Sequence, residues 1–266
     1  MNPQLSLSNP AFRLSANLDA DDVYLHLHSN QADFDLAAAP YCYRAVLRQG
    51  STRIHLRALE NPHLELQGES LWIRGTLAGL QLTHHLRLGT GAHLPAEGGE
   101  LMEQISLYNP GDSPVVLEDF ACGLQRRLTD RIGRPLPELQ EERFQAIPFL
   151  HRPTDPSGYD NDFSIPDLLH TCGREIRLGE VPVFTEYQGH VPSHQRYSEG
   201  WAWRHGDFTF VLSKFSHETM EFSLLAIDPE PAEGVFLRFG GAGLMNGEPS
   251  ALLKILPGQQ VTLGET

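Results

Sequence analysis

Lysine is scarce in this sequence of 266 residues. Lys214 and Lys254 are its two lysines, and the longest basic run is Arg126-Arg127. Aspartate and glutamate number 34 against 20 for lysine and arginine, which gives a formal net charge of −14. Because nucleic acids and anionic membrane surfaces are bound by clustered Lys and Arg, we expect neither as a partner. This acidic composition suits a neutral ligand such as a sugar, but it also suits mere solubility, which is the simpler interpretation.

Cysteine and long apolar runs are also nearly missing. Cys42, Cys122 and Cys172 are far apart, odd in number and outside any CxxC pair, so we expect no disulfide framework. The N-terminus lacks the basic and apolar stretches of a signal peptide, and no apolar run approaches the ~18 residues needed to cross a bilayer. These absences predict a cytoplasmic protein with reduced thiols and no cofactor.

Helical periodicity is the third absence, because no segment keeps a 3.6-residue period convincingly over three turns. Alternation with a period of two residues dominates instead, for example in VYLHLH (23–28) and LQLTHHLRL (80–88). Further short strand candidates are separated by Gly, Pro and Asn at the spacing of an antiparallel sandwich. The sequence therefore predicts an all-β, antiparallel fold.

One long segment interrupts this pattern, at about residues 147–170. It carries four prolines and an acidic centre that includes Asp160 and Asp162. Long loops inside compact domains are often functional. We find no internal repeat and no linker, and residues 1–266 are predicted to form a single β-sandwich domain with this central loop.

Three histidines in the first half are candidates for chemistry. His26 and His28 lie at i and i+2 on one strand face, a spacing that can bind zinc if a third ligand comes from elsewhere. A polar pair facing solvent explains them without a metal, and we expect no metal. His84 lies on the apolar face of residues 80–88 and is interpreted as a hydrogen-bonded core histidine, whereas His85 is expected to face solvent.

The richest cluster of functional side chains is GHVPSHQRYSEGWAW, residues 189–203. Carbohydrate sites combine aromatic rings, which stack on the sugar, with side chains that bind its hydroxyls. An alternative is that the two tryptophans, at i and i+2 on one strand face, belong to the core. The candidate sugar-binding residues of this segment are His194, Gln195, Glu199, Trp201 and Trp203.

The order of motifs from Gly189 to Thr266 resembles a known family. Ser193–Gln195 (SHQ) follows Gly189, strand-like stretches come next, and the segment ends in LKILPGQQVTLGET. This ending predicts a strand, a turn at PGQQ and the start of another strand. The arrangement resembles the N-terminal domain of family 36 glycoside hydrolases, the α-galactosidase group, in which a strand, a turn and a strand also close the domain. The resemblance implies a β-supersandwich of the galactose-mutarotase type, which in that family precedes a catalytic (β/α)₈ barrel.

The resemblance also implies a division of labour. The retaining mechanism of that family uses two aspartates on the barrel, and such carboxylates must flank the scissile bond. We therefore expect a barrel after residue 266, no catalytic residue in this chain, and a supporting role in which the domain packs on the barrel, forms homo-oligomers and lends residues to a galactoside pocket. The resemblance makes Asp160 and Asp162 of the central loop candidate carbohydrate-binding residues for that pocket. Whether the chain is itself an enzyme is left open.

Two other functions stay open. A separate sugar epimerase of the mutarotase type needs a general acid, usually His, and a general base, usually Glu. His194 or His205 would serve with Glu186 or Glu199. The other alternative is a carbohydrate-binding module without enzymatic activity.

Overall fold

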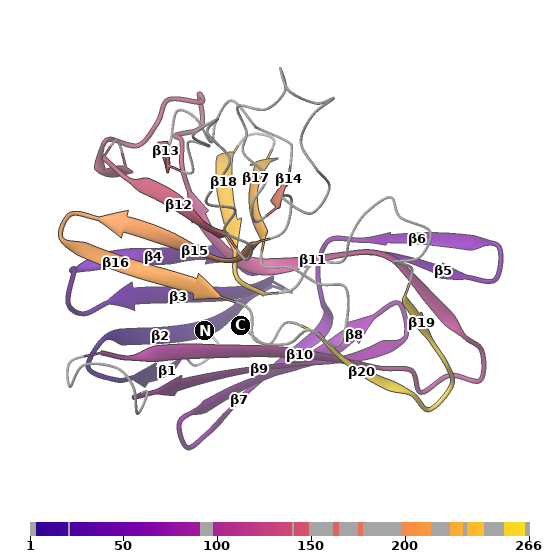
Figure 1. Ribbon diagram of the computed structural model, residues 1–266. Helices are drawn as coiled ribbons and strands as arrows, with labels where there is room; N and C mark the ends of the chain where they lie inside the picture. Colours follow the sequence, from indigo (N-terminus) through magenta and orange to yellow (C-terminus); the bar gives the residue numbers. More distant parts are fainter. Residues whose placement is uncertain are drawn as a thin grey trace. The chain divides into compact units, whose positions relative to one another are not determined.

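The computed structural model describes residues 4–20, 22–90, 98–139, 141–148, 162–164, 175–177, 198–213, 224–230, 233–241 and 253–263. The chain divides into two compact units. Unit 1 comprises residues 1–125, 216–221 and 241–266, and unit 2 comprises residues 126–215 and 222–240. Each unit is described by itself below, with the strand labels of Figure 1.

The first sheet of unit 1 is a four-stranded meander with the order β1-β2-β3-β4. In β3 the buried side chains of Val23, Leu25 and Leu27 alternate with half-buried ones, because successive side chains of a strand point to opposite faces. The alternation predicted for residues 23–28 is thereby confirmed. The strands are β1 (Leu5–Ser8), β2 (Phe12–Asp19), β3 (Asp22–Ser29) and β4 (Phe34–Pro40).

The second sheet of unit 1 has the order β20-β10-β9-β8-β7. Its central strand β9 alternates as predicted, with all four leucines and His84 on the buried face. The strands are β7 (Glu60–Gln67), β8 (Ser70–Leu77), β9 (Leu80–Gly89), β10 (Glu100–Tyr108) and β20 (Gln260–Leu263).

A third group of strands in unit 1 is organised by β5 (Cys42–Gln49), which pairs with β6 (Thr52–Leu56) and with β11 (Val115–Arg127). The start of β11 also pairs with β19 (Leu253–Ile255). The chain turns between β19 and β20 at Gly258, whose positive φ of 73° suits glycine. The strand, turn and strand that the sequence predicts for this segment are therefore confirmed.

The core of unit 1 is built mainly from leucine and alanine, with valine, isoleucine, tyrosine and phenylalanine. Full burial of one such aliphatic side chain stabilises the fold by roughly 1.5–3 kcal/mol, so this set supplies most of the driving force. Cys122 is buried as expected, Cys42 is half-buried, and no disulfide occurs in the described part of the chain. Side chains that are almost completely inaccessible include Leu14, Leu25, Tyr43, Leu47, Ile73, Leu82, Ile105 and Phe120.

Unit 2 contains a sheet of order β13-β12-β15-β16 and a second group in which β17 pairs with β14 and β18. A short 3₁₀ helix, η1 (Pro137–Leu139), precedes β12. The strands are β12 (Arg143–Pro148), β13 (Asp162–Ser164), β15 (Ser198–His205), β16 (Phe208–Ser213), β14 (Glu175–Arg177), β17 (Leu224–Glu230) and β18 (Gly234–Phe239).

The predicted fold class is confirmed. All pairings described between strands are antiparallel, and no α-helix occurs among the described residues. A membrane-spanning helix is likewise missing from that part of the chain.

The predicted central loop at 147–170 lies largely outside the described residues. Within it, residues 162–164 form β13, which pairs with β12. The single-domain boundary and the barrel after residue 266 stay predictions.

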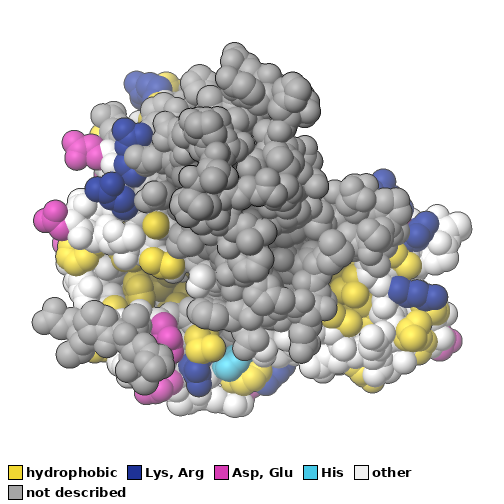
Figure 2. Space-filling model, in the orientation of Figure 1, with side chains coloured by type: hydrophobic (Ala, Val, Ile, Leu, Met, Phe, Trp, Pro, Cys, Tyr) yellow, Lys and Arg dark blue, Asp and Glu magenta, His cyan; other side chains and the backbone are white. Residues whose placement is uncertain are grey.

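Figure 2 shows one face of the molecule. On its described part, the Lys and Arg side chains stand in small groups separated by hydrophobic and uncharged atoms. That part of the face carries no continuous basic surface.

Candidate functional site

The structure describes few of the predicted carbohydrate-binding side chains. Asp160, His194 and Gln195 lie outside the described residues. Asp162 is the first residue of β13, and Glu199 lies in β15 at a register shift opposite Ile147 and Pro148. For both, the backbone alone is described. Sugar binding by this group stays a prediction.

Trp201 and Trp203 are placed in the interior of unit 2, with 0% and 1% of their surface exposed. The Trp203 ring packs against Phe144 at 5.1 Å and Phe239 at 5.4 Å between centroids. Aromatic pairs at this separation add to the hydrophobic stabilisation. The interpretation of these tryptophans as core residues is confirmed, and neither ring presents a face to solvent.

Beside Trp203 lies a carboxylate that the sequence did not single out. Glu142 directly precedes β12, whose first residue Arg143 is registered with Arg204 of β15, the neighbour of His205. Trp203 Nε1 donates to Glu142 Oε2, and His205 Nδ1 bonds Glu142 Oε1. We name Glu142 and His205 the unit 2 dyad.

The two members of the unit 2 dyad differ in their access to solvent. The Glu142 side chain is 2% exposed, while 27% of the His205 side chain is exposed. Burial raises the pKa of the Glu142 carboxyl, and the hydrogen bonds from His205 and Trp203 offset part of that rise. A carboxyl with a raised pKa, bonded to an accessible imidazole, is the arrangement that general acid–base chemistry uses.

His205 and Glu199 are too far apart to act together as the acid and the base on one sugar ring. The two residues are six positions apart on β15, which at the rise of a strand separates them by about 20 Å. Glu186, the other predicted partner, lies outside the described residues. Glu142 was missed because its proximity to His205 depends on strand pairing across 63 positions.

Unit 1 contains a second His–Glu contact, and it is entirely internal. His84 Nε2 lies 2.8 Å from Glu103 Oε1, and His84 Nδ1 lies 2.8 Å from the Tyr43 hydroxyl. The Tyr41 hydroxyl donates to Glu103 Oε1 at 2.6 Å, and the Gly241 N–H donates to Oε2 at 2.5 Å. His84 is thus the hydrogen-bonded core histidine that the sequence predicts.

The charges of this internal network are set by its partners. Burial raises the pKa of Glu103, but the hydrogen bonds from His84, Tyr41 and Gly241 outweigh it and hold that pKa below its usual value. Burial raises the pKa values of Tyr41 and Tyr43 well above the usual range, so both phenols are neutral, and the Tyr41 hydroxyl donates to Glu103. Because His84 is 0% exposed and Glu103 is 4% exposed, a substrate cannot reach them, and we assign the network a structural role.

His85, on the other face of β9, is only partly exposed to solvent. Its ring stacks on Trp72 with 3.9 Å between centroids, and its Nε2 lies 2.9 Å from the Ser70 hydroxyl. Burial lowers the pKa of His85, and the charge of Arg87 lowers it further. The expectation that His85 faces solvent is therefore met only in part.

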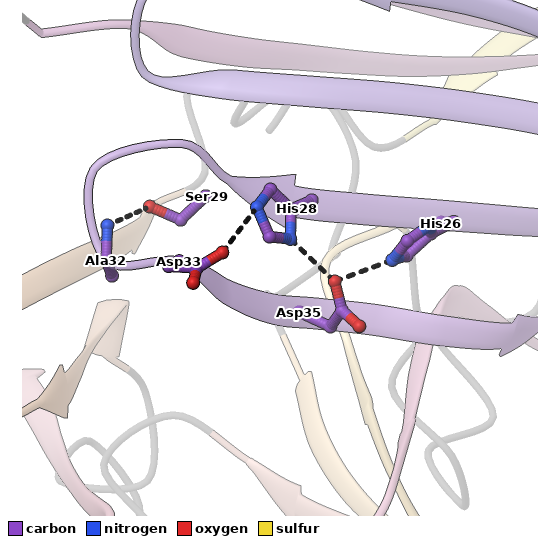
Figure 3. A network of polar contacts seen from close by, with 6 residues as sticks. All are labelled: His26, His28, Ser29, Ala32, Asp33 and Asp35. Carbon is purple, nitrogen blue, oxygen red and sulfur yellow. Dashed lines mark hydrogen bonds and ion pairs between the residues drawn. The ribbon is translucent and has the colours of Figure 1, made fainter.

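A third group of polar side chains lies on the first sheet. His26 and His28 of β3 both contact Asp35 of β4 (Figure 3). Burial alone would raise the pKa of Asp35, but hydrogen bonds from His28 and His26 outweigh it and lower that pKa. Asp35 is the third residue that the sequence analysis required for a zinc site and did not identify.

Comparison with known proteins shows the fold. No family model and no curated protein sequence matches the chain. The crystal structure of a galactose mutarotase related enzyme from Lactobacillus acidophilus is similar, with a TM-score of 0.53, over 98% of this chain and 95% of that one. The sequence identity is 9%, so the likeness extends to the fold. The chain therefore has the galactose-mutarotase-like, antiparallel β-sandwich fold that the sequence predicts.

Proposed function

We propose that this chain is an aldose-epimerase-like protein that binds a free sugar and speeds the exchange of its anomers. The observation that supports the proposal is the fold match to a galactose mutarotase related enzyme over nearly the whole of both chains. The acidic composition agrees with a neutral sugar as ligand. The fold match thus favours the epimerase alternative over the interpretation as a non-catalytic domain of a larger enzyme.

The unit 2 dyad provides groups suited to this chemistry. His205 Nδ1–H donates a hydrogen bond to the Glu142 carboxylate, and such a bond fixes the tautomer and the orientation of an imidazole. We assign His205 Nε2, on the opposite side of the ring, as the atom that exchanges a proton with the sugar. Glu142 is then a positioning residue, because its buried side chain meets His205 and not the substrate.

The proposed reaction balances its protons without a cofactor. His205 gives a proton to the ring oxygen O5 while the anomeric hydroxyl loses its proton to a solvent water, and the C1–O5 bond breaks to give the open-chain aldehyde. Rotation about the C1–C2 bond presents the other face of the carbonyl. The ring closes as the hydroxyl at C5 attacks C1, and both protons return.

The test is the rate of mutarotation of freshly dissolved α-D-galactose and α-D-glucose, followed by polarimetry with and without the full chain. We expect the wild-type chain to accelerate the change, and His205→Asn and Glu142→Gln to lose at least tenfold of that acceleration. His63→Asn is the matched control, because His63 is an exposed histidine of unit 1. An acceleration equal in wild type and His205→Asn overturns the assignment, and no acceleration by wild type overturns the function.

A second candidate function is the one that the resemblance implies, a supporting domain of a family 36 glycoside hydrolase. The observation in its favour is the strand, turn and strand from Leu253 to Leu263, which matches the pattern quoted for that family. This function predicts no mutarotation, no hydrolysis of nitrophenyl α-galactoside by the chain, and a coding sequence for a barrel downstream of residue 266. Hydrolysis by the chain alone would contradict it.

A further inference from the structure

The first sheet of unit 1 gathers two imidazoles and a carboxylate in one small space (Figure 3). His26 Nε2 lies 2.6 Å from Asp35 Oδ1, and His28 Nδ1 lies 2.7 Å from the same oxygen. These three ligand atoms all lie within 4.8 Å of one another. The cluster shares no residue with the unit 2 dyad and has no part in the proposed function.

An irregularity in the pairing of β3 with β4 aims the carboxylate at the histidines. Leu27 is registered with Ala37 and His28 with Asp35, so Leu36 is an extra residue in β4. Leu36 and Ala37 are consecutive buried residues, and beyond them Asp35 returns to the partly exposed face. A bulge of this kind re-aims a side chain, and such bulges are over-represented near functional sites.

A small side chain lies opposite His26 on β4. Ala38, the residue registered with His26, has a small and exposed side chain. The side chains of His26, His28 and Asp35 are 39%, 15% and 40% exposed, so the donor atoms are held by the sheet and still open to solvent. An ion can therefore enter from solvent without unfolding any strand.

The donor set and its spacing suit zinc. Zinc takes imidazole nitrogen and carboxylate oxygen at about 2.0–2.2 Å in tetrahedral geometry, which places neighbouring donors roughly 3.3 Å apart. The present separations of 2.6 and 2.7 Å to Asp35 need to widen by about 0.6–0.7 Å, a change within reach of side-chain rotation. Three protein ligands leave a fourth position for water.

A second carboxylate occupies the place of an outer-shell partner. Asp33 Oδ1 lies 3.6 Å from His28 Nε2, the ring nitrogen that does not contact Asp35. Histidines that bind metals usually donate their other nitrogen to a carboxylate, which orients the ring. The turn that carries Asp33 is held by the Ala32 N–H, which donates to the Ser29 hydroxyl at 3.2 Å.

The charges of the cluster also match a divalent cation. Asp33 and Asp35 supply two negative charges beside two imidazoles. On the adjoining strand β2, the positively charged Arg13 is registered with His28, and its side chain is exposed to solvent. We propose that His26, His28 and Asp35 form a three-ligand zinc site with Asp33 as the outer-shell partner of His28.

The experiment measures zinc uptake by the untagged full chain. Isothermal titration with zinc chloride gives the stoichiometry and affinity, and we expect one zinc per chain. His26→Asn, His28→Asn and Asp35→Asn each should weaken binding at least tenfold, and Asp33→Asn about tenfold, the low end of outer-shell effects. His55→Asn, a change at an exposed histidine outside the cluster, should bind like wild type.

Cobalt substitution supplies a readout that does not depend on affinity. Cobalt(II) at the site should give the intense visible absorption of tetrahedral coordination in wild type and not in His28→Asn. Circular dichroism of each variant establishes that the fold is kept, which we expect because the cluster lies on the partly exposed face. Equal zinc binding by wild type and the His26→Asn/His28→Asn double variant, or no zinc binding by folded wild type, overturns the proposal.

Discussion

His84 and Glu103 are joined by a 2.8 Å hydrogen bond in the interior of unit 1, on the paired strands β9 and β10. In the register His84 faces Ile105, two positions from Glu103, so the two side chains are diagonal neighbours on the same sheet face. Two tyrosine hydroxyls and a backbone N–H complete the network. A polar core network of this kind is stabilising only while each member keeps its partners.

The first prediction concerns loss of the charged member. Glu103→Gln should lower the free energy of unfolding by about 1–3 kcal/mol, because an amide cannot replace a carboxylate that accepts from three donors. Urea unfolding followed by circular dichroism measures the change. Glu69→Gln, at an exposed glutamate, should change stability by less than about 0.5 kcal/mol. Equal effects of the two substitutions would show that the network contributes nothing.

The second prediction is a dependence on pH. The folded-state pKa of Glu103 lies below the unfolded value of about 4.3, so its contribution to stability is complete above that value and is lost as the pH falls through the folded-state pKa. The difference in unfolding free energy between wild type and Glu103→Gln should therefore shrink in acid. Urea titrations of both proteins from about pH 7 to about pH 3 measure it. A difference that stays constant over this range contradicts the assignment.

The third prediction tests a close approach at Gly241. Its φ of +62° is left-handed, and a Cβ there would lie 2.4 Å from the Cys122 carbonyl oxygen. Gly68 has a similar φ of +59° with nothing within 4 Å of its Cβ position. Gly68→Ala should cost roughly 1–2 kcal/mol from backbone strain alone, and Gly241→Ala at least about 1 kcal/mol more from overpacking. Thermal unfolding of the two variants compares them, and a smaller loss for Gly241→Ala would refute the steric argument.

The fourth prediction concerns the indole N–H that Trp203 donates to Glu142. Trp203→Phe keeps an aromatic ring against Phe144 and Phe239 but removes the donor, so it should destabilise the fold by about 1–3 kcal/mol. Trp72→Phe is the matched change at a half-buried ring stacked on His85 and should cost less. Chemical denaturation measures both. Equal losses would mean that ring volume, and not the hydrogen bond, decides the effect.

Much of the fold could be predicted because its information is local. Alternation in residues 23–28 and 80–88 fixes which side chains point inward, since successive residues of a strand face opposite ways. The same rule predicted that His84 lies on the buried face. It also predicted that Trp201 and Trp203 share one strand face, and both are buried. Composition alone indicated an acidic chain with few thiols and lysines.

The sites depend on pairings that no local pattern contains. Glu142 meets His205 because β12 pairs with β15, and Asp35 meets His26 and His28 because an extra residue in β4 shifts the register by one. A shift of one residue reverses the face of every side chain beyond it, so alternation alone cannot assign such neighbours. The sequence by itself thus determined the all-β fold class and the buried faces of the strands that alternate regularly, and the tertiary structure decided which polar side chains meet.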